Sequence, residues 1–167
     1  MDIIVYTDGS TLNNQHKGQR KGGVGVFFGD NDSRNKSIEL IESATNKVTN
    51  QVAEISACIE AIESIIIQPN IYKSILIKSD SMYTINCITK WCKNWEKKGW
   101  RKSDGKIIEN LELIQKLYKY SNDYNVHYEH IKAHKTQPAL DSPKYADWYG
   151  NMKADMLATN ASKNISL

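Results

Sequence analysis

The chain has 167 residues, of which 40% are hydrophobic and 25% are charged, and its formal net charge is +3. This length suits one domain over residues 1–167, and the composition excludes a disordered or fibrous chain. The opening residues contain no apolar run long enough for a signal peptide or a membrane span, so we expect an intracellular protein of the cytoplasm or nucleus with no membrane partner. The cysteines Cys58, Cys87 and Cys92 form no CxxC pair, which indicates reduced, buried thiols.

Hydrophobic patterning predicts elements in the order βββαβααβα. The first three strands, joined by short links, suggest an antiparallel meander. The later strand, helix, strand crossover makes the following strands parallel to the first. We therefore expect an α/β fold with a five-stranded mixed β-sheet flanked by helices. The predicted strands cover 2–8, 22–28, 36–43, 72–80 and 125–132, and the predicted helices cover 50–67, 81–96, 106–121 and 147–160.

Positive charge is concentrated in one segment, residues 90–106. Seven basic residues against two acidic ones give it a net charge of +5, which leaves −2 for the rest of the chain. We expect a basic protrusion there that docks an anionic partner, and the alternative is a solvated charged face.

Carboxylates end two of the predicted strands, at Asp8 and Asp80. If these strands are parallel neighbours, both acids lie at the carboxyl edge of the sheet, where open α/β sheets bind ligands. Glu54 lies in the first turn of the helix over 50–67 and shares its inward stripe with Cys58. Taken singly, each acid is better explained as a cap, a turn residue or an acid at a helix N-terminus. Three converging carboxylates, however, repel one another unless a cation such as Mg²⁺ lies among them.

Asp155 is a candidate fourth acid, four residues beyond Asn151. Periodicity alone does not bring it to the sheet edge, and without further information a solvated helix acid is the preferred interpretation. Asp147 is a minor competitor for the same role.

Four segments together resemble type 1 ribonuclease H, and the long third segment is most similar to the eukaryotic members. The segments are YTDGS, TNQVAEISA, KSDSMYTINCITKWCKNWEKKGWRKSDGK and HIKAHKT followed by GNMKADMLA. The resemblance implies the ribonuclease H-like fold and an endoribonuclease that hydrolyses the RNA strand of RNA–DNA hybrids. It implies a mechanism with two Mg²⁺ ions, for which Mn²⁺ substitutes, and products with 5′-phosphate and 3′-hydroxyl ends. We expect a monomer that acts in DNA replication or R-loop removal.

The resemblance also assigns catalytic roles. The family's four catalytic, metal-binding acids match Asp8, Glu54, Asp80 and Asp155, and its mobile histidine matches His134. Asp8 would bridge both ions, Glu54 and Asp80 would hold the ion near the leaving group, and Asp155 would hold the ion that carries the attacking water. His134 would assist proton movement or product release, and its alternative is a loop histidine bonded to backbone.

Nucleic-acid contacts follow from the same resemblance. The positions that match contacts to RNA 2′-hydroxyls are Asn14, Asn50 and Gln51. The positions that match contacts to the DNA strand are Lys47, Thr49, Tyr83, Trp95 and Asn110, together with Lys97, Lys98, Arg101 and Lys102 of the protrusion. The alternatives are turn or cap chemistry for the amides and core anchoring for the tryptophans, and we expect Trp91 to be a core residue.

Two features depart from the family pattern. The loop after His134 is longer than usual, with KTQPALDSPKYADWY inserted before GNMKAD, while Asn151 and Ala154 favour Asp155 over Asp147 as the fourth acid. The first strand begins at once, so we expect no N-terminal hybrid-binding module.

Other site chemistries remain open. A zinc site is disfavoured because His127 and His130 point to opposite faces of a strand. Two alternative functions are a catalytically silent hybrid-binding module and a nuclease of the wider superfamily that acts on DNA.

Overall fold

The computed structural model describes residues 2–12, 20–68, 72–133 and 136–163. Within them, a five-stranded mixed sheet has the strand order β3-β2-β1-β4-β5. Strand β1 pairs antiparallel with β2 and parallel with β4, so the predicted mixed sheet is confirmed. The strands are β1 (Asp2–Thr11), β2 (Lys21–Phe27), β3 (Lys36–Ile41), β4 (Ser74–Ser79) and β5 (Val126–His130).

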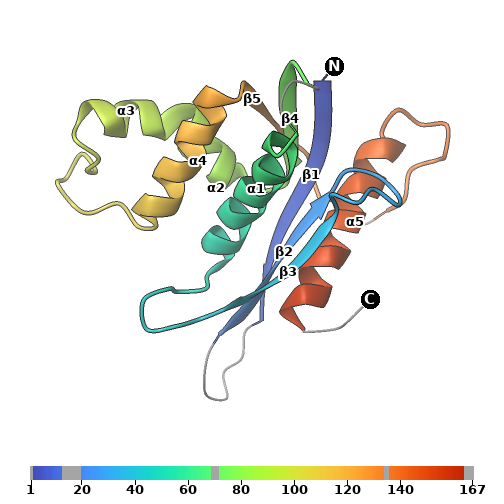
Figure 1. Cartoon of the computed structure of the whole chain (residues 1–167), viewed down its shortest axis with the longest axis horizontal. Helices are drawn as coiled ribbons and strands as arrows, with labels where there is room; N and C mark the ends of the chain where they lie inside the picture. The colour runs from blue at the N-terminus through green and yellow to red at the C-terminus, as the bar shows by residue number, and fades with distance from the viewer. Residues whose placement is uncertain (1, 13–19, 69–71, 134–135, 164–167) are drawn as a thin grey trace.

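Helices cover both faces of the sheet, as Figure 1 shows. Helices α1 and α4 lie on one side and α5 lies on the other. The segment between α3 and α4 projects from the body as the predicted protrusion (Figure 1). No helix in the described part of the chain is long and apolar enough to cross a bilayer. The helical elements are α1 (Asn50–Ile66), α2 (Met82–Asn86), the π-helix η1 (Cys87–Trp91), α3 (Cys92–Lys97), α4 (Leu111–Asp123) and α5 (Tyr145–Ser162).

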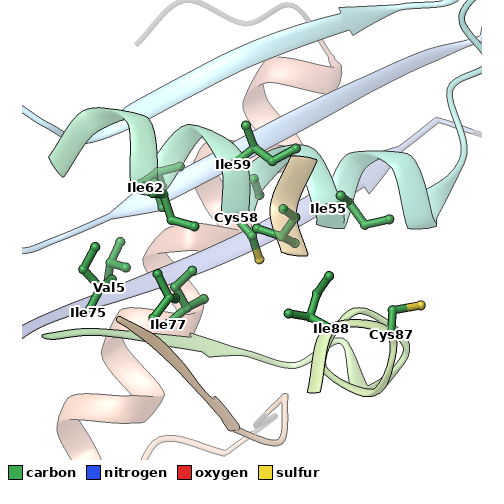
Figure 2. Packing of buried hydrophobic residues seen from close by; sticks show 14 of the residues in the cluster. Val5, Ile55, Cys58, Ile59, Ile62, Ile75, Ile77, Cys87 and Ile88 are labelled. Carbon is green, nitrogen blue, oxygen red and sulfur yellow. The ribbon is translucent and has the colours of Figure 1, made fainter. Parts of the chain in front are cut away.

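The main core lies between α1 and the sheet. Because apolar residues recur along α1 at helical spacing, one stripe of the helix faces the strands. Figure 2 shows this packing, in which Ile55, Cys58 and Ile62 of α1 face the strands that carry Val5 and Ile77. The cysteines Cys58, Cys87 and Cys92 are free and buried, as expected.

Helix α5 lies directly against β2 because that strand has no side chains at the contact. A Cβ atom added to Gly25 would lie 2.0 Å from the carbonyl oxygen of Ala154, and one added to Gly23 would lie 1.9 Å from that of Ala158. Contacts this short do not occur between real atoms, so glycine permits the close approach.

Two predicted helices differ from the structure in detail. The helix expected over 81–96 contains a π-helical middle, in which the amide of Cys92 donates to the carbonyl of Cys87. Thr89 Oγ1 also donates to the carbonyl of Ile85, and such back-bonding distorts a helix. The helix expected from residue 106 begins only at Leu111, because Asn110 has a left-handed backbone (φ 59°) that a right-handed helix does not continue.

Candidate functional site

Carboxylates from three elements lie together at one edge of the sheet. Asp8, Glu54 and Asp80 each offer an oxygen within 4.8 Å of the others. A cavity of about 400 Å³ opens onto these groups, and Asp155 of α5 lines it too. The structure therefore brings together all four acids that the sequence singled out.

Parallel pairing of β1 with β4 brings Asp8 beside Asp80. The pairing ends at Tyr6 opposite Lys78, and Asp80 follows the end of β4. Strand β1 continues to Thr11, beyond its predicted end at residue 8, because its last residues pair with the glycine-rich start of β2.

Glu54 reaches the same place because α1 begins close to β1. A Cβ atom at Gly9 would lie 2.5 Å from the backbone nitrogen of Glu54, so only glycine allows this approach. Thr49 caps the helix by accepting a hydrogen bond from the amide of Val52 at 3.2 Å. Glu54 Oε2 is buried and has no hydrogen-bond partner among the described residues.

Burial and mutual repulsion shift the protonation of the acids. Asp8 is only 5% exposed, and its pKa is raised far above the usual value. Burial is the largest cause, and the charges of Glu54 and Asp80 raise the pKa further. Burial also raises the pKa of Glu54, although hydrogen bonds with Asp8 and Gly9 oppose the shift. The pKa of Asp80 is raised by burial and then by the charge of Asp155.

These carboxylates fit a divalent cation. The donors are hard oxygens, one of them an unpartnered buried atom, and carboxyl groups gathered this closely need a counter-charge if all are to be ionised at neutral pH. A cation among them would satisfy Glu54 Oε2 and lower all the raised pKa values.

Asp147, the competing candidate for the fourth acid, lies elsewhere. Its Oδ1 accepts hydrogen bonds from the Tyr6 hydroxyl and from Lys78 Nζ, both at 2.7 Å. The Lys78 side chain is 13% exposed and also lies 3.6 Å from Glu129. Asp147 thus anchors the first turn of α5 to β1 and β4, whereas Asp155 lines the cavity.

The predicted nucleic-acid contacts fall into separate groups around the acids. Asn50, Gln51 and Tyr83 line the same cavity as the acids. Lys47 and Asn110 line a second, larger groove of about 720 Å³. Asn14 and His134 lie outside the described residues.

Three aromatic residues form a row that starts at the cavity, in which Tyr83 and Trp95 are half-buried and Trp91 is exposed. The ring centroids of Tyr83 and Trp91 are 5.9 Å apart, as are those of Trp91 and Trp95. Trp91 is 38% exposed, so its expected core role is wrong. The π-helical turn that ends at Trp91 brings it to this row, and nothing in the residue pattern reveals such a turn.

The basic residues of the protrusion are exposed to solvent. They extend from the end of α3 into the segment that follows, where Arg101 forms an isolated bridge with Ile107. The exposed residues are Lys97, Lys98, Arg101 and Lys102.

Ser81 also lines the cavity, although its residue type does not mark it as a site residue. It caps α2 by accepting a hydrogen bond from the amide of Thr84 at 3.2 Å, and it lines the cavity next to Asp80. A serine directly before a helical stretch was the available signal.

Comparisons with known proteins match this chain to a single protein family. A family model described as RNase H matches residues 1–163. Ribonuclease H of Schizosaccharomyces pombe is 39% identical over 155 residues, which cover 93% of this chain and 51% of that protein. Ribonuclease H of Ruthia magnifica is 32% identical over 157 residues, which cover 94% of this chain and 98% of that protein.

Solved structures agree with these matches. The crystal structure of LC9-RNase H1, a type 1 RNase H with the type 2 active-site motif, superposes with a TM-score of 0.71 at 26% identity, covering 99% of this chain and 74% of that one. The chain spans about half the length of the first curated relatives it matches.

Proposed function

The chain belongs to the RNase H family, and from that membership we propose that it is an endoribonuclease that hydrolyses the RNA strand of RNA–DNA hybrids. The observation that carries the proposal is the convergence of Asp8, Glu54 and Asp80 on a cavity that Asp155 also lines. The family match covers all four acids, and the aromatic row and the basic protrusion lie on α2, η1, α3 and the segment after α3, which follow Asp80 in the chain.

Asp8, Glu54, Asp80 and Asp155 would hold two Mg²⁺ ions, for which Mn²⁺ would substitute. When bound, the ions would activate the attacking water and stabilise the leaving 3′ oxygen, which gives 5′-phosphate and 3′-hydroxyl ends. Asp8 is the most deeply buried of the four acids and lies within reach of both Glu54 and Asp80, which supports the family's role for it as a ligand that both ions would share. His134 would exchange protons with the reacting groups or the product.

Substrate choice would depend on the amides beside the acids. Asn50 and Gln51 line the cavity, where they would donate to and accept from the 2′-hydroxyl groups that distinguish RNA from DNA. Asn14 would make a similar contact.

The DNA strand would lie along the aromatic row and the protrusion. Tyr83 and Trp95 would pack against deoxyribose, and a DNA phosphate would bind near Lys47, Thr49 and Asn110. Lys97, Lys98, Arg101 and Lys102 would contact further phosphates. We expect the protein to act as a monomer on hybrids of the kind formed in replication and in R-loops.

The proposed function is tested with end-labelled duplexes of one sequence: an RNA–DNA hybrid, a double-stranded RNA and a double-stranded DNA. We expect Mg²⁺-dependent cleavage of the RNA strand in the hybrid alone. Binding of the hybrid without cleavage, at any concentration of Mg²⁺ or Mn²⁺, would identify a silent hybrid-binding module. Preferred cleavage of duplex DNA would identify a DNA-acting nuclease instead.

A further inference from the structure

Asp155 of α5 approaches Asp8 of β1 at the place where α5 crosses the neighbouring strand β2, which has no side chain at the crossing point. Asp8 of β1 pairs with Gly25 of β2. Gly25 lies under Ala154 of α5, where an added Cβ atom would be 2.0 Å from the carbonyl oxygen of Ala154. Asp155 is the next residue of that helix, and it contributes to the raised pKa of Asp8.

We propose that Gly25 is a positioning residue that sets the distance between Asp155 and Asp8, and thereby the affinity of the site for divalent ions. The inference rests on the proposed metal-dependent function of these acids. Gly25 itself contacts neither the ions nor the substrate.

A side chain at position 25 would push α5 away from β2. The clash would be with the backbone of Ala154, so no change of rotamer relieves it. The contact would have to open from 2.0 Å to at least 3.0 Å, a distance below which real Cβ contacts essentially never occur. The turn of α5 that carries Asp155 would therefore move away from the sheet by about the same amount, because a close-packed interior transmits such a displacement and does not absorb it.

The N-terminal end of α5 is fixed to β1 and β4 by its own contacts, so the displacement of the helix would be greatest farther along, near Asp155. Asp147 is bonded to Tyr6 and Lys78, and a Cβ atom at Gly150 would meet the ring of Tyr6 at 2.4 Å. With this end fixed, a side chain at position 25 would tilt the helix and withdraw the Asp155 carboxylate from the cavity.

A merely structural role for Gly25 predicts a different result. It would lower the free energy of unfolding but leave the folded protein with its normal metal affinity. A positioning role changes the metal affinity of the folded protein, and a longer acid at position 155 compensates for the change. Glutamate reaches further than aspartate by one carbon–carbon bond, roughly 1.5 Å, which is similar to the expected displacement.

The experiment titrates the metal-free full chain with Mn²⁺ by calorimetry and measures the Mg²⁺ dependence of hybrid cleavage in parallel. The variants are Gly25→Ala, Asp155→Glu, the double variant, and Gly29→Ala as the matched control, because a Cβ atom at Gly29 meets nothing within 4 Å. Circular dichroism establishes that each variant is folded.

We expect Gly25→Ala to weaken Mn²⁺ affinity about tenfold, in the range typical of residues that orient metal ligands. Asp155→Glu alone should also weaken the affinity, and the double variant should recover most of what Gly25→Ala loses. Wild-type affinity in folded Gly25→Ala, or no recovery in the double variant, would overturn the proposal.

If only the double variant folds, its Mn²⁺ affinity decides: an affinity above that of Asp155→Glu supports the positioning role, and an equal or lower affinity overturns it. If neither Gly25→Ala nor the double variant folds, the role of Gly25 is structural and the proposal is overturned. Failure of the proposed function gives a separate result: the wild-type chain would bind Mn²⁺ and show the compensation but would cleave no hybrid.

Discussion

Asp8 on β1 and Asp80 after β4 hold carboxylate oxygens within 4.8 Å of each other at the end of a parallel strand pair. Hydrophobic residues of both strands enter the same core, so the packing that stabilises the sheet also holds the two carboxyl groups together. Hydrophobic burial of a single isoleucine contributes about 1.5–3 kcal/mol, enough to offset part of the repulsion without a bound ion. The site is therefore held under electrostatic strain that a cation relieves.

Replacing Asp80 with asparagine should abolish Mg²⁺-dependent hybrid cleavage and preserve the fold. The substitution removes one anionic ligand at nearly constant volume. We therefore expect a loss of more than about 100-fold in kcat/KM, which exceeds the loss typical when a residue that only hydrogen-bonds to a metal ligand is changed. Cleavage of a labelled hybrid measures the effect. Asp141→Asn, which changes an exposed acid outside the cavity, is the control. Near-wild-type turnover in Asp80→Asn would remove Asp80 from the catalytic set.

Replacing Asp8 with asparagine should stabilise the metal-free protein at neutral pH. The raised pKa of Asp8 means that the folded state binds a proton more readily than the unfolded chain. Stability is therefore lost as the pH rises from about 4, the ordinary pKa of aspartate, through the raised pKa. We expect Tm to rise by roughly 2 to 8 °C at pH 7, since 1 kcal/mol corresponds to about 2–4 °C in a domain of this size.

Scanning calorimetry at several pH values checks this prediction. The gain should shrink toward pH 4, where the wild-type carboxyl is protonated in the folded state and about half protonated in the unfolded chain. Saturating Mg²⁺ should reduce or reverse the gain, because only the wild-type site then gains from binding. A lower Tm for Asp8→Asn at pH 7 without metal would contradict the strained site.

Neutralising the protrusion should weaken hybrid binding and flatten its dependence on salt. Changing Lys97, Lys98, Arg101 and Lys102 to glutamine removes positive charges that neutralise phosphates, and each charge removed lowers the slope of log affinity against log salt by roughly 0.9. Fluorescence anisotropy at several salt concentrations with Ca²⁺ in place of Mg²⁺ measures the slope. The control set changes four other exposed lysines to glutamine: Lys73, Lys119, Lys144 and Lys163. Equal slopes for both sets would show that the protrusion is only a solvated surface.

The anchor of α5 gives a stability prediction that is independent of metal. Tyr6→Phe removes a largely buried hydroxyl that donates to the Asp147 carboxylate at 2.7 Å. We expect a loss of about 1.5–3 kcal/mol in the free energy of unfolding, the range for hydrogen bonds to charged groups. Tyr149→Phe is the matched control, because its hydroxyl donates to Asp30 at the same 2.7 Å but in an exposed pair. Urea unfolding compares the two variants, and equal losses would show that burial adds nothing at Tyr6.

The sequence predicts the order of the elements because the hydrophobic period changes visibly between strands and helices. It also predicts that Asp8, Glu54 and Asp80 converge, since parallel strands end at one edge and the stripe on α1 faces inward. The contribution of Gly25 is invisible in the sequence, because it depends on which helix crosses that strand and how closely. The start of α4 was missed for a local reason, the left-handed backbone of Asn110.

Other expectations remain predictions. Asn14 and His134 lie outside the described residues, and Thr49, expected to bind a DNA phosphate, uses its hydroxyl to cap α1. Its capping bond engages one lone pair of the oxygen, so the hydroxyl proton stays available to an anion.

The π-turn between α2 and α3 has a consequence for how surfaces of this kind are compared. Eight residues along a regular α-helix rotate a side chain by about 80° relative to its starting direction, which would point Tyr83 and Trp91 apart. The wider turn of η1 absorbs part of this rotation, and the two rings meet at 5.9 Å. A protein with the same aromatics at the same eight-residue spacing but a regular α-helix through this turn would display them in diverging directions, so helix phase, and not aromatic content, decides whether the two rings meet.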